Sequence, residues 1–273
     1  MPAYFHRMVG AEMLKIITRV SGWAGLFLSA LIPLLVTCML VWMQPEAVDP
    51  NAAPDMNAAM MQSMIPDQAF TVLDWTLTGR NILIMPMVLL LITAQLFAGE
   101  WSERTLRSLL LRPVSRASVL MAKFSALWIY AGACLLVSYL FALAGGWIFL
   151  GHEAEIIGVT KGYGVCWLRD GALLGVGMLV STFAPSVAGV VVGTILGLIG
   201  ELMLSAGLKG ADALLSLGWP AQVTPWMPSA ALWESWEGYE ELDWPMEPMG
   251  ALAILFVVVI AGSLLRFSRL DVP

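Results

Sequence analysis

Charged residues are scarce in this chain: they make up 12% of its 273 residues, about half the share found in an ordinary soluble domain. Hydrophobic residues make up 59%. A soluble fold of this length could not bury so much apolar surface in one core, so lipid must be the solvent for most of it. The composition therefore predicts an integral membrane protein, and we expect no nucleic-acid partner.

The residues and motifs of common catalytic sites are also rare. The chain has two histidines, His6 and His152, and neither an HExxH nor a GxSxG motif, so a membrane enzyme would depend on His152 reaching a serine in a span. The cysteines Cys38, Cys134 and Cys166 form no CxxC pair, and we interpret them as packing residues. No GxxxxGK[ST] phosphate loop occurs, so the chain does not hold ATP by that route.

Apolar segments long enough to cross a bilayer are abundant, since one crossing takes roughly 20 residues. The run 171–208 contains no Lys or Arg and is about twice the length of one crossing. Pro185 near its middle disfavours helical geometry at Ala184, so we predict a turn there and two spans instead of one. The predicted spans are 22–43, 81–99, 122–146, 164–184, 187–207 and 249–266, all within a single domain, 1–273.

The basic residues predict the orientation of these spans. With six spans, most of the fourteen Lys and Arg residues lie on the same side as both termini, and basic loops mark the cytoplasmic side. With five spans, Arg266 and Arg269 would face away from the basic loop before the third span. We therefore predict an all-α membrane protein with six transmembrane helices and both termini in the cytoplasm. Residues 1–21 interleave apolar and basic side chains, which predicts an N-terminal helix at the membrane interface.

A short charged segment follows the second predicted span and reads GEWSERTLRSLLLRPVSRASVLMAK from Gly99 to Lys123. Glu100 and Glu103 each stand four residues before an arginine, which stabilises an exposed helix. Pro113 ends that helix, and the stretch 115–118 can cap the start of the next span. These features alone are also consistent with a basic anchor that binds lipid headgroups and contacts no partner.

This segment resembles the cytoplasmic loop of the type-2 ABC exporter permease family, in which an acidic residue, a GTLR-like stretch, an LL…PVSR stretch and a membrane-proximal lysine recur. Arg104 departs from the pattern, because the family often has glycine there. The resemblance implies a permease of the bacterial inner membrane that dimerises and docks onto separate ATPase subunits; these carry the ATP and magnesium, and this chain binds no cofactor or metal. It implies a coupling helix whose ATPase contacts are Glu100, Glu103, Arg104, Thr105, Leu106, Arg107, Arg112 and Arg116.

Two further features fall within the predicted spans. Gly189, Gly193 and Gly197 recur at four-residue spacing, which lets helix backbones approach closely, either within one subunit or at a dimer seam. Arg169 and Glu201 fall at similar depth in neighbouring spans. Because charges inside a membrane normally pair or face a cavity, we predict an ion pair between these two side chains.

The segments predicted outside the membrane leave alternatives open. Residues 44–79 carry a methionine cluster between Met56 and Met64, which suits either a soft metal such as Cu(I) or an amphipathic helix resting on the bundle. Residues 209–248 carry five tryptophans, which suit an interfacial cap. The predicted function is export of an unidentified substrate, powered by a separate ATPase. The alternatives are a non-transporting anchor that passes on mechanical work, a copper-maturation permease and a membrane enzyme.

Overall fold

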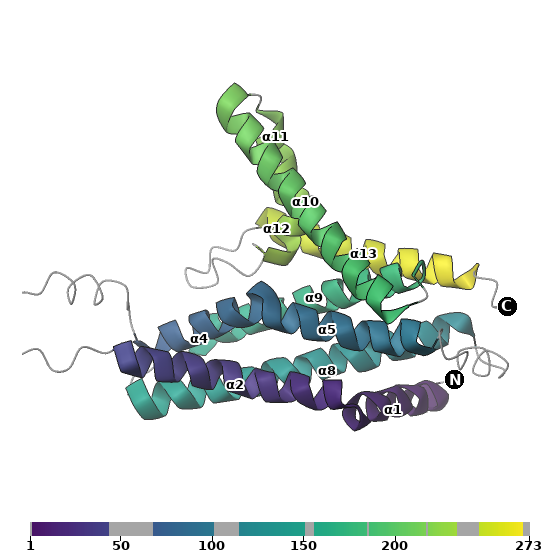
Figure 1. Cartoon of the computed structure of the whole chain (residues 1–273), viewed down its shortest axis with the longest axis horizontal. Helices are drawn as coiled ribbons and strands as arrows, with labels where there is room; N and C mark the ends of the chain where they lie inside the picture. The colour runs from purple at the N-terminus through teal and green to yellow at the C-terminus, as the bar shows by residue number, and fades with distance from the viewer. Residues whose placement is uncertain are drawn as a thin grey trace, which may run out of the picture.

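The computed structural model of the chain is an elongated bundle of helices (Figure 1). It describes residues 2–43, 68–100, 115–150, 156–184, 186–216, 218–233 and 246–269. Every regular element in these ranges is a helix, as the sequence predicts. The elements are α1 (Pro2–Thr18), α2 (Val20–Met43), α4 (Gln68–Gly79), η1 (Arg80–Ile84), α5 (Met85–Ala94), η2 (Gln95–Gly99), α8 (Arg116–Gly145), η3 (Gly146–Leu150), α9 (Ile156–Ser181), α10 (Val187–Leu215), α11 (Trp219–Val223), η4 (Thr224–Trp226), α12 (Pro228–Trp233) and α13 (Met246–Ser268).

Five helices among the described residues are long and apolar enough to cross a membrane: Val20–Trp42, Arg116–Ile148, Thr160–Ser181, Val187–Leu215 and Met246–Ser268. Each overlaps one of the predicted spans. The remaining predicted span, 81–99, lies in a continuous helical run made of α4, η1, α5 and η2, and its apolar part, Met85–Gly99, is shorter. A sixth crossing therefore stays a prediction.

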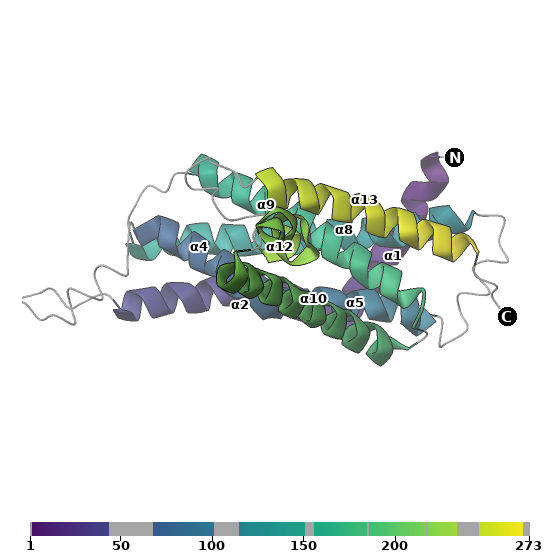
Figure 2. The ribbon, with the colours of Figure 1, turned by 90° about the horizontal axis from the view of Figure 1, so that it is seen from above.

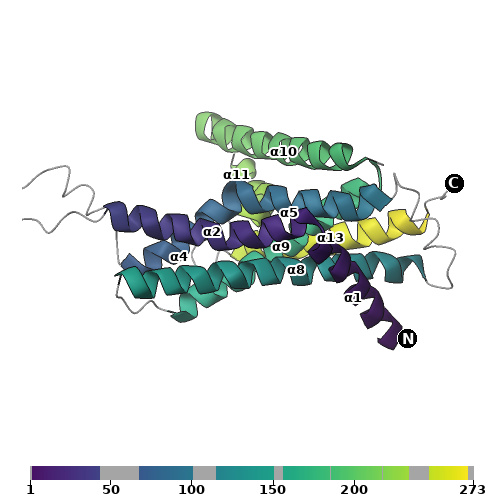
Figure 3. The ribbon, with the colours of Figure 1, turned by 60° about the horizontal axis from the view of Figure 1, so that its bottom comes forward.

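The N-terminal segment forms a helix, as predicted, and it bends sharply away from α2 (Figure 3). The bend depends on Gly22, because a Cβ at this position would collide with the carbonyl oxygen of Ile16. The Tyr130 hydroxyl on α8 donates a 2.6 Å hydrogen bond to the Gly22 carbonyl and holds the bend against the bundle. This arrangement lays α1 alongside the start of α8.

Two predicted local features are confirmed. The chain turns between Ser181 at the end of α9 and Val187 at the start of α10, and the Ser186 hydroxyl accepts a hydrogen bond from the Gly189 amide as an N-cap. Ser115 caps α8 in the same way, since its hydroxyl accepts from the amide three residues later. Both caps satisfy amides that the first helical turn leaves without a partner.

Helix α10 leaves the bundle part-way along its length. It begins beside α5 and α9 and then rises away from them (Figures 1 and 2). A Cβ at Gly193 would meet Val180 of α9 at 3.5 Å, whereas a Cβ at Gly197 would meet nothing within 4 Å. A Cβ at Gly189 would meet only the preceding turn, at Ser186 and Ala184. Packing against α9 within the subunit therefore accounts for Gly193 alone.

The main core lies where α5, α8, α9 and α13 meet. Leu89, Leu127 and Leu174 are fully buried there. Trp128 and Trp167 join α8 to α9, because their rings stack at 4.7 Å and each indole donates a 3.0 Å hydrogen bond to the carbonyl of the other residue. The rigid packing of these helices fixes the positions of the charged side chains described below.

Candidate functional site: two charged clusters on one helical run

The helical run 68–100 contains two π-helical segments, η1 and η2. A π-helical turn places more residues in a turn than an α-helix does, so it shifts the faces to which side chains point, and it occurs often at functional sites. Arg80 and Asn81 begin η1, and Glu100 follows η2 directly. Each of these positions anchors a cluster of buried charges.

We call the first group the basal cluster, because it lies at the end of the bundle that holds α1 and the end of α13. It consists of Glu12 and Lys15 on α1, Glu100 after η2, and Lys123 on α8. Lys15 Nζ lies 2.8 Å from Glu12 Oε1 and 2.7 Å from Glu100 Oε1. Lys123 Nζ lies 2.9 Å from Glu12 Oε2 and 2.7 Å from Glu100 Oε2. The four charges thus form a closed ring in which the signs alternate.

Burial makes this ring strong. Glu12, Glu100 and Lys123 are 5%, 5% and 1% exposed, while Lys15 reaches water. Lys123 Nζ also donates a hydrogen bond to the Leu96 carbonyl at 3.3 Å. A buried charge is tolerated only when it is paired and hydrogen-bonded, and here each charge has two opposite neighbours. The ring therefore ties α1, η2 and α8 together at one point.

The ring also shifts the pKa values of Glu100 and Lys15. Burial by itself would raise the pKa of Glu100, but the charge and hydrogen bonds of Lys123 and Lys15 outweigh it and hold that pKa below its ordinary 4.5. Burial by itself would lower the pKa of Lys15, but Glu100 and Glu12 outweigh it and hold that pKa above its ordinary 10.5. Both groups stay charged throughout the neutral range.

We expect α1 to stay attached to α8 between about pH 5 and pH 10. The depressed pKa of Glu100 means that its contribution is present above its unfolded pKa and is lost as pH falls through the lower folded value. The raised pKa of Lys15 means that its contribution is present below its unfolded pKa and is lost as pH rises through the higher folded value. Spin labels at the exposed positions Leu14 and Ile129 should report a constant distance over this window. Separation of the labels near neutral pH would contradict the ring. In E100Q, the increase in label distance expected at acid pH should disappear.

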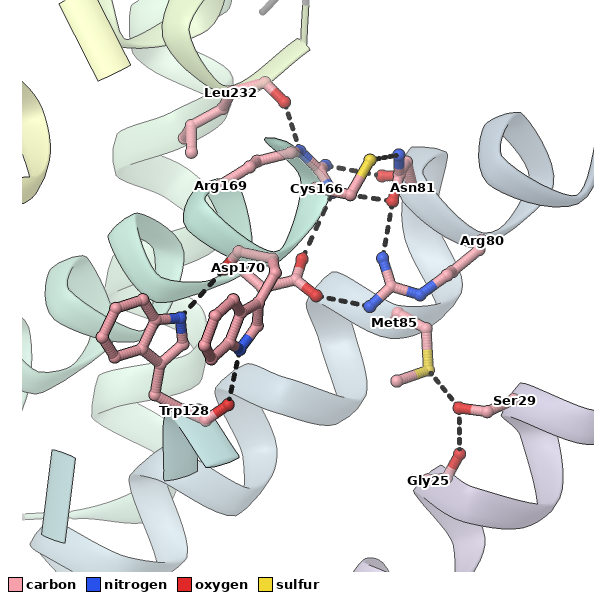
Figure 4. A network of polar contacts seen from close by, with 11 residues as sticks. Gly25, Ser29, Arg80, Asn81, Met85, Trp128, Cys166, Arg169, Asp170 and Leu232 are labelled. Atoms are coloured by element: carbon pink, nitrogen blue, oxygen red, sulfur yellow. Dashed lines mark hydrogen bonds and ion pairs between the residues drawn. The ribbon is translucent and has the colours of Figure 1, made fainter. Parts of the chain in front are cut away.

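We call the second group the distal cluster, because it lies on the same helical run but away from the basal end (Figure 4). It consists of Arg80, Asn81, Arg169 and Asp170. Arg80 donates hydrogen bonds to Asn81 Oδ1 at 2.8 Å and to Asp170 Oδ2. Arg169 donates to the same Asn81 Oδ1 at 2.9 Å, to the Asn81 carbonyl at 2.9 Å and to the Leu232 carbonyl of α12. Asp170 Oδ1 lies 3.5 Å from the Arg169 guanidinium. Two cations therefore converge on one amide oxygen and one carboxylate.

These side chains are fully shielded from solvent. Arg80, Asn81, Arg169 and Asp170 are at most 1% exposed, and Asn81 also donates a 3.2 Å hydrogen bond to the buried thiol of Cys166. Because ion pairs are costly to separate in such an environment, the cluster holds the helical run 68–100, α9 and the short helix α12 in one arrangement.

The predicted ion pair between Arg169 and Glu201 is wrong. The Arg169 guanidinium is directed to Asn81, Asp170 and Leu232, and both buried carboxylate oxygens of Glu201 have no hydrogen-bond partner. The sequence places the two residues at similar depth but does not tell which face of α9 meets α10. The helix packing brings Arg80 and Asn81, not Glu201, to the face that Arg169 occupies.

The predicted ATPase contacts are divided between described and other residues. Arg116 lies at the end of the bundle near α1, where its guanidinium donates a 3.5 Å hydrogen bond to the Ser268 carbonyl. Glu100 is buried in the basal cluster, and its predicted contact with the ATPase stays a prediction. Glu103, Arg104, Thr105, Leu106, Arg107 and Arg112 lie outside the described residues, as do the methionine cluster and His152.

Sequence reasoning missed most members of the two clusters. In the sequence, Lys123 stands out only as the membrane-proximal lysine of the resemblance, and Arg80 is an isolated cation before an apolar run. The signal that could have found them is a single charge inside a long apolar segment, which normally has a buried partner. Among the described residues, no group of three or more His, Cys, Asp and Glu side chains is placed to hold a metal ion.

The comparison with protein families decides the class of this chain. The family model described as ABC-2 family transporter protein matches residues 8–204. The chain belongs to the ABC-2 transporter family. The match extends over the charged residues of both clusters, and with the five long apolar helices it identifies a multi-pass membrane permease of a transport system. The comparison with curated proteins found no match for this permease.

Proposed function

We propose that this permease is the membrane-spanning subunit of an ABC exporter, with six crossings, both termini in the cytoplasm and a separate ATPase as its energy source. The observation that carries the proposal is the basal cluster. It sits directly before residues 101–114, the part of the chain whose sequence resembles a coupling helix. Glu100, the last described residue before this segment, is held by Lys15 on α1 and Lys123 on α8.

This arrangement gives a physical route for coupling. A displacement of residues 101–114 by the ATPase would pull on Glu100, and the buried ion pairs would move α1, η2 and α8 together. The helical run 68–100 connects Glu100 to Arg80, where the distal cluster joins the run to α9 and α12. One helical run therefore carries a polar attachment at Glu100 and another twenty residues earlier at Arg80, which suits it to transmit movement across the bundle.

The exposed face of α10 supports a homodimer with α10 at the seam. Leu196, Met203 and Leu204 on this helix are 64%, 65% and 57% exposed. Gly197 and Gly200 have open space where a Cβ would stand, so a second helix could approach the backbone closely at these points. The dimer would provide the second docking site that an ABC transporter with two ATPase subunits requires.

Copurification tests the proposed function. We expect the tagged permease to retain an ATP-binding subunit when both are expressed together, and the double charge reversal R107E/R116E to lose most of it without unfolding the bundle. The matched control is K161E/K209E, which also reverses two cations but lies away from the basal end; both of these lysines are exposed. The ATPase should therefore be lost from R107E/R116E and retained by K161E/K209E.

Retention of the ATPase by R107E/R116E would contradict the docking site. ATP-dependent flux into inverted vesicles that contain the assembled complex tests transport itself. Export predicts accumulation inside such vesicles, whereas ATP hydrolysis without any flux would identify a mechanical anchor instead of a transporter.

A further inference from the structure

The π-helical turn η1 leaves one of its backbone carbonyls without a donor from the helix itself. The Met85 amide donates to the Arg80 carbonyl, five residues earlier, whereas in an α-helix it would donate to the Asn81 carbonyl, four residues earlier. The amide five residues after Asn81 would belong to Pro86, which has no N–H to donate. The Asn81 carbonyl therefore needs a partner from outside its own helix.

Arg169 on α9 is that partner (Figure 4). Its Nη2 donates a hydrogen bond to the Asn81 carbonyl and its Nη1 donates one to Asn81 Oδ1, both at 2.9 Å. Asn81 and Arg169 are each 1% exposed, so the protein itself must satisfy these buried groups. One guanidinium thus clamps both oxygens of a single residue in the π turn.

Pro86 makes the register of this turn a choice between two states. In the π register, the carbonyl without a helical donor is that of Asn81. In an α register, the Met85 amide would return to Asn81, and Pro86 would instead leave the Ile82 carbonyl without a donor. For these two carbonyls, neither register gains a helical hydrogen bond over the other, and α-helical turns are far commoner. The clamp by Arg169 is therefore the contact that favours the π register.

The third donor of Arg169 connects the turn to α12. Its Nε donates a hydrogen bond to the Leu232 carbonyl in the last turn of α12, a short helix that packs against α9, α10 and α13. The five donors of a guanidinium have a fixed geometry, so Arg169 cannot follow a displaced α12 and keep its grip on Asn81. The position of α12 and the register of η1 therefore meet at one side chain.

We propose that η1 is a conformational switch and that Arg169 operates it. With α12 in the position described above, Arg169 holds η1 in the π register. When α12 moves away, Arg169 releases Asn81 and η1 becomes α-helical. Loss of the extra residue from the turn rotates the helix on one side of η1 relative to the other side by about 100°. The switch belongs to the permease alone and does not rest on the proposed export function.

Pairs of spin labels on the purified full-length permease test the switch. Labels at Thr78 and Met87 flank η1, and Met87 is 38% exposed. In a continuous α-helix these positions lie on opposite faces, about two and a half turns apart, whereas an extra residue in the turn brings them closer. R169M removes the clamp and leaves the pair between Arg80 and Asp170, so it should lengthen the label distance by roughly 4 Å.

A control pair and a second substitution test the reason for this change. Labels at Ile129 and Leu136, two exposed positions within α8, should keep one distance in every variant. P86A restores an amide at position 86, so the helix has a donor for the orphan carbonyl in either register. P86A and P86A/R169M should therefore give the same distance between Thr78 and Met87.

The link to α12 is tested with Arg169 in place. Ala231 on α12 is fully buried, so A231W should displace this helix and lengthen the distance between Thr78 and Met87 as R169M does. V223W, at an exposed position on α11, is the matched control and should leave the distance unchanged. An unchanged distance in R169M or in A231W would overturn the proposal, and so would an equal effect of R169M with and without P86A.

Discussion

Replacing Lys123 with methionine is expected to cost the permease about 3–5 kcal/mol of unfolding free energy and to uncouple it from its ATPase. Lys123 is 1% exposed and neutralises Glu12 and Glu100 at once. Without it, two buried carboxylates share only Lys15, and their repulsion should release α1 from α8. Denaturation of the purified chain measures the loss of stability. ATP-dependent transport by the assembled complex measures the loss of coupling.

Two variants make this prediction specific to the ring. K161M removes an exposed lysine and should be nearly neutral, because surface charges contribute little. The double variant K123M/E12Q should recover a large part of the lost stability, because it leaves a simple pair between Lys15 and Glu100. If K123M behaved like K161M, the basal cluster would have no structural role.

Replacing Asp170 with asparagine is expected to be the most damaging change in the distal half, with a loss of about 3–5 kcal/mol. Asp170 is fully buried between Arg80 and Arg169, whose guanidinium groups already meet at Asn81 Oδ1. Removal of the carboxylate leaves Arg80 with the neutral Asn81 as its partner, beside a second cation. R80Q should cost less, because it leaves the Arg169–Asp170 pair.

The double variant D170N/R80Q should be more stable than D170N alone, which a double-mutant cycle measures as a coupling energy. E201Q serves as the matched carboxylate control. Because neither Glu201 oxygen has a partner, this change should be neutral or slightly stabilising. A large loss of stability in E201Q would indicate an ion pair between Glu201 and Arg169. Additive losses in the D170N/R80Q cycle would contradict the distal cluster.

The features that the sequence predicts correctly are local or depend on length alone. An apolar run of about 20 residues forms a helix in lipid because each backbone group must be satisfied within its own segment. The turn before Ser186 and the cap at Ser115 depend on residues within four positions of each other. No tertiary information is needed for either.

The partners of the buried charges could not be predicted in this way. Glu12 and Lys123 are 111 residues apart, and Arg80 and Asp170 are 90 residues apart. Equal depth in neighbouring spans suggested Arg169 and Glu201, yet the rotation of α9 about its own axis turns Arg169 toward Asn81. That rotation is set by packing such as the Trp128–Trp167 stack, which no short segment encodes.

The amino-acid sequence by itself determined that this protein is a helical membrane protein, because the bilayer imposes length and hydropathy on every span. The tertiary structure alone decided which cation meets which carboxylate. The physical reason is that the energy of a buried charge depends on neighbours a few ångströms away in space, and only the packing of the helices chooses those neighbours.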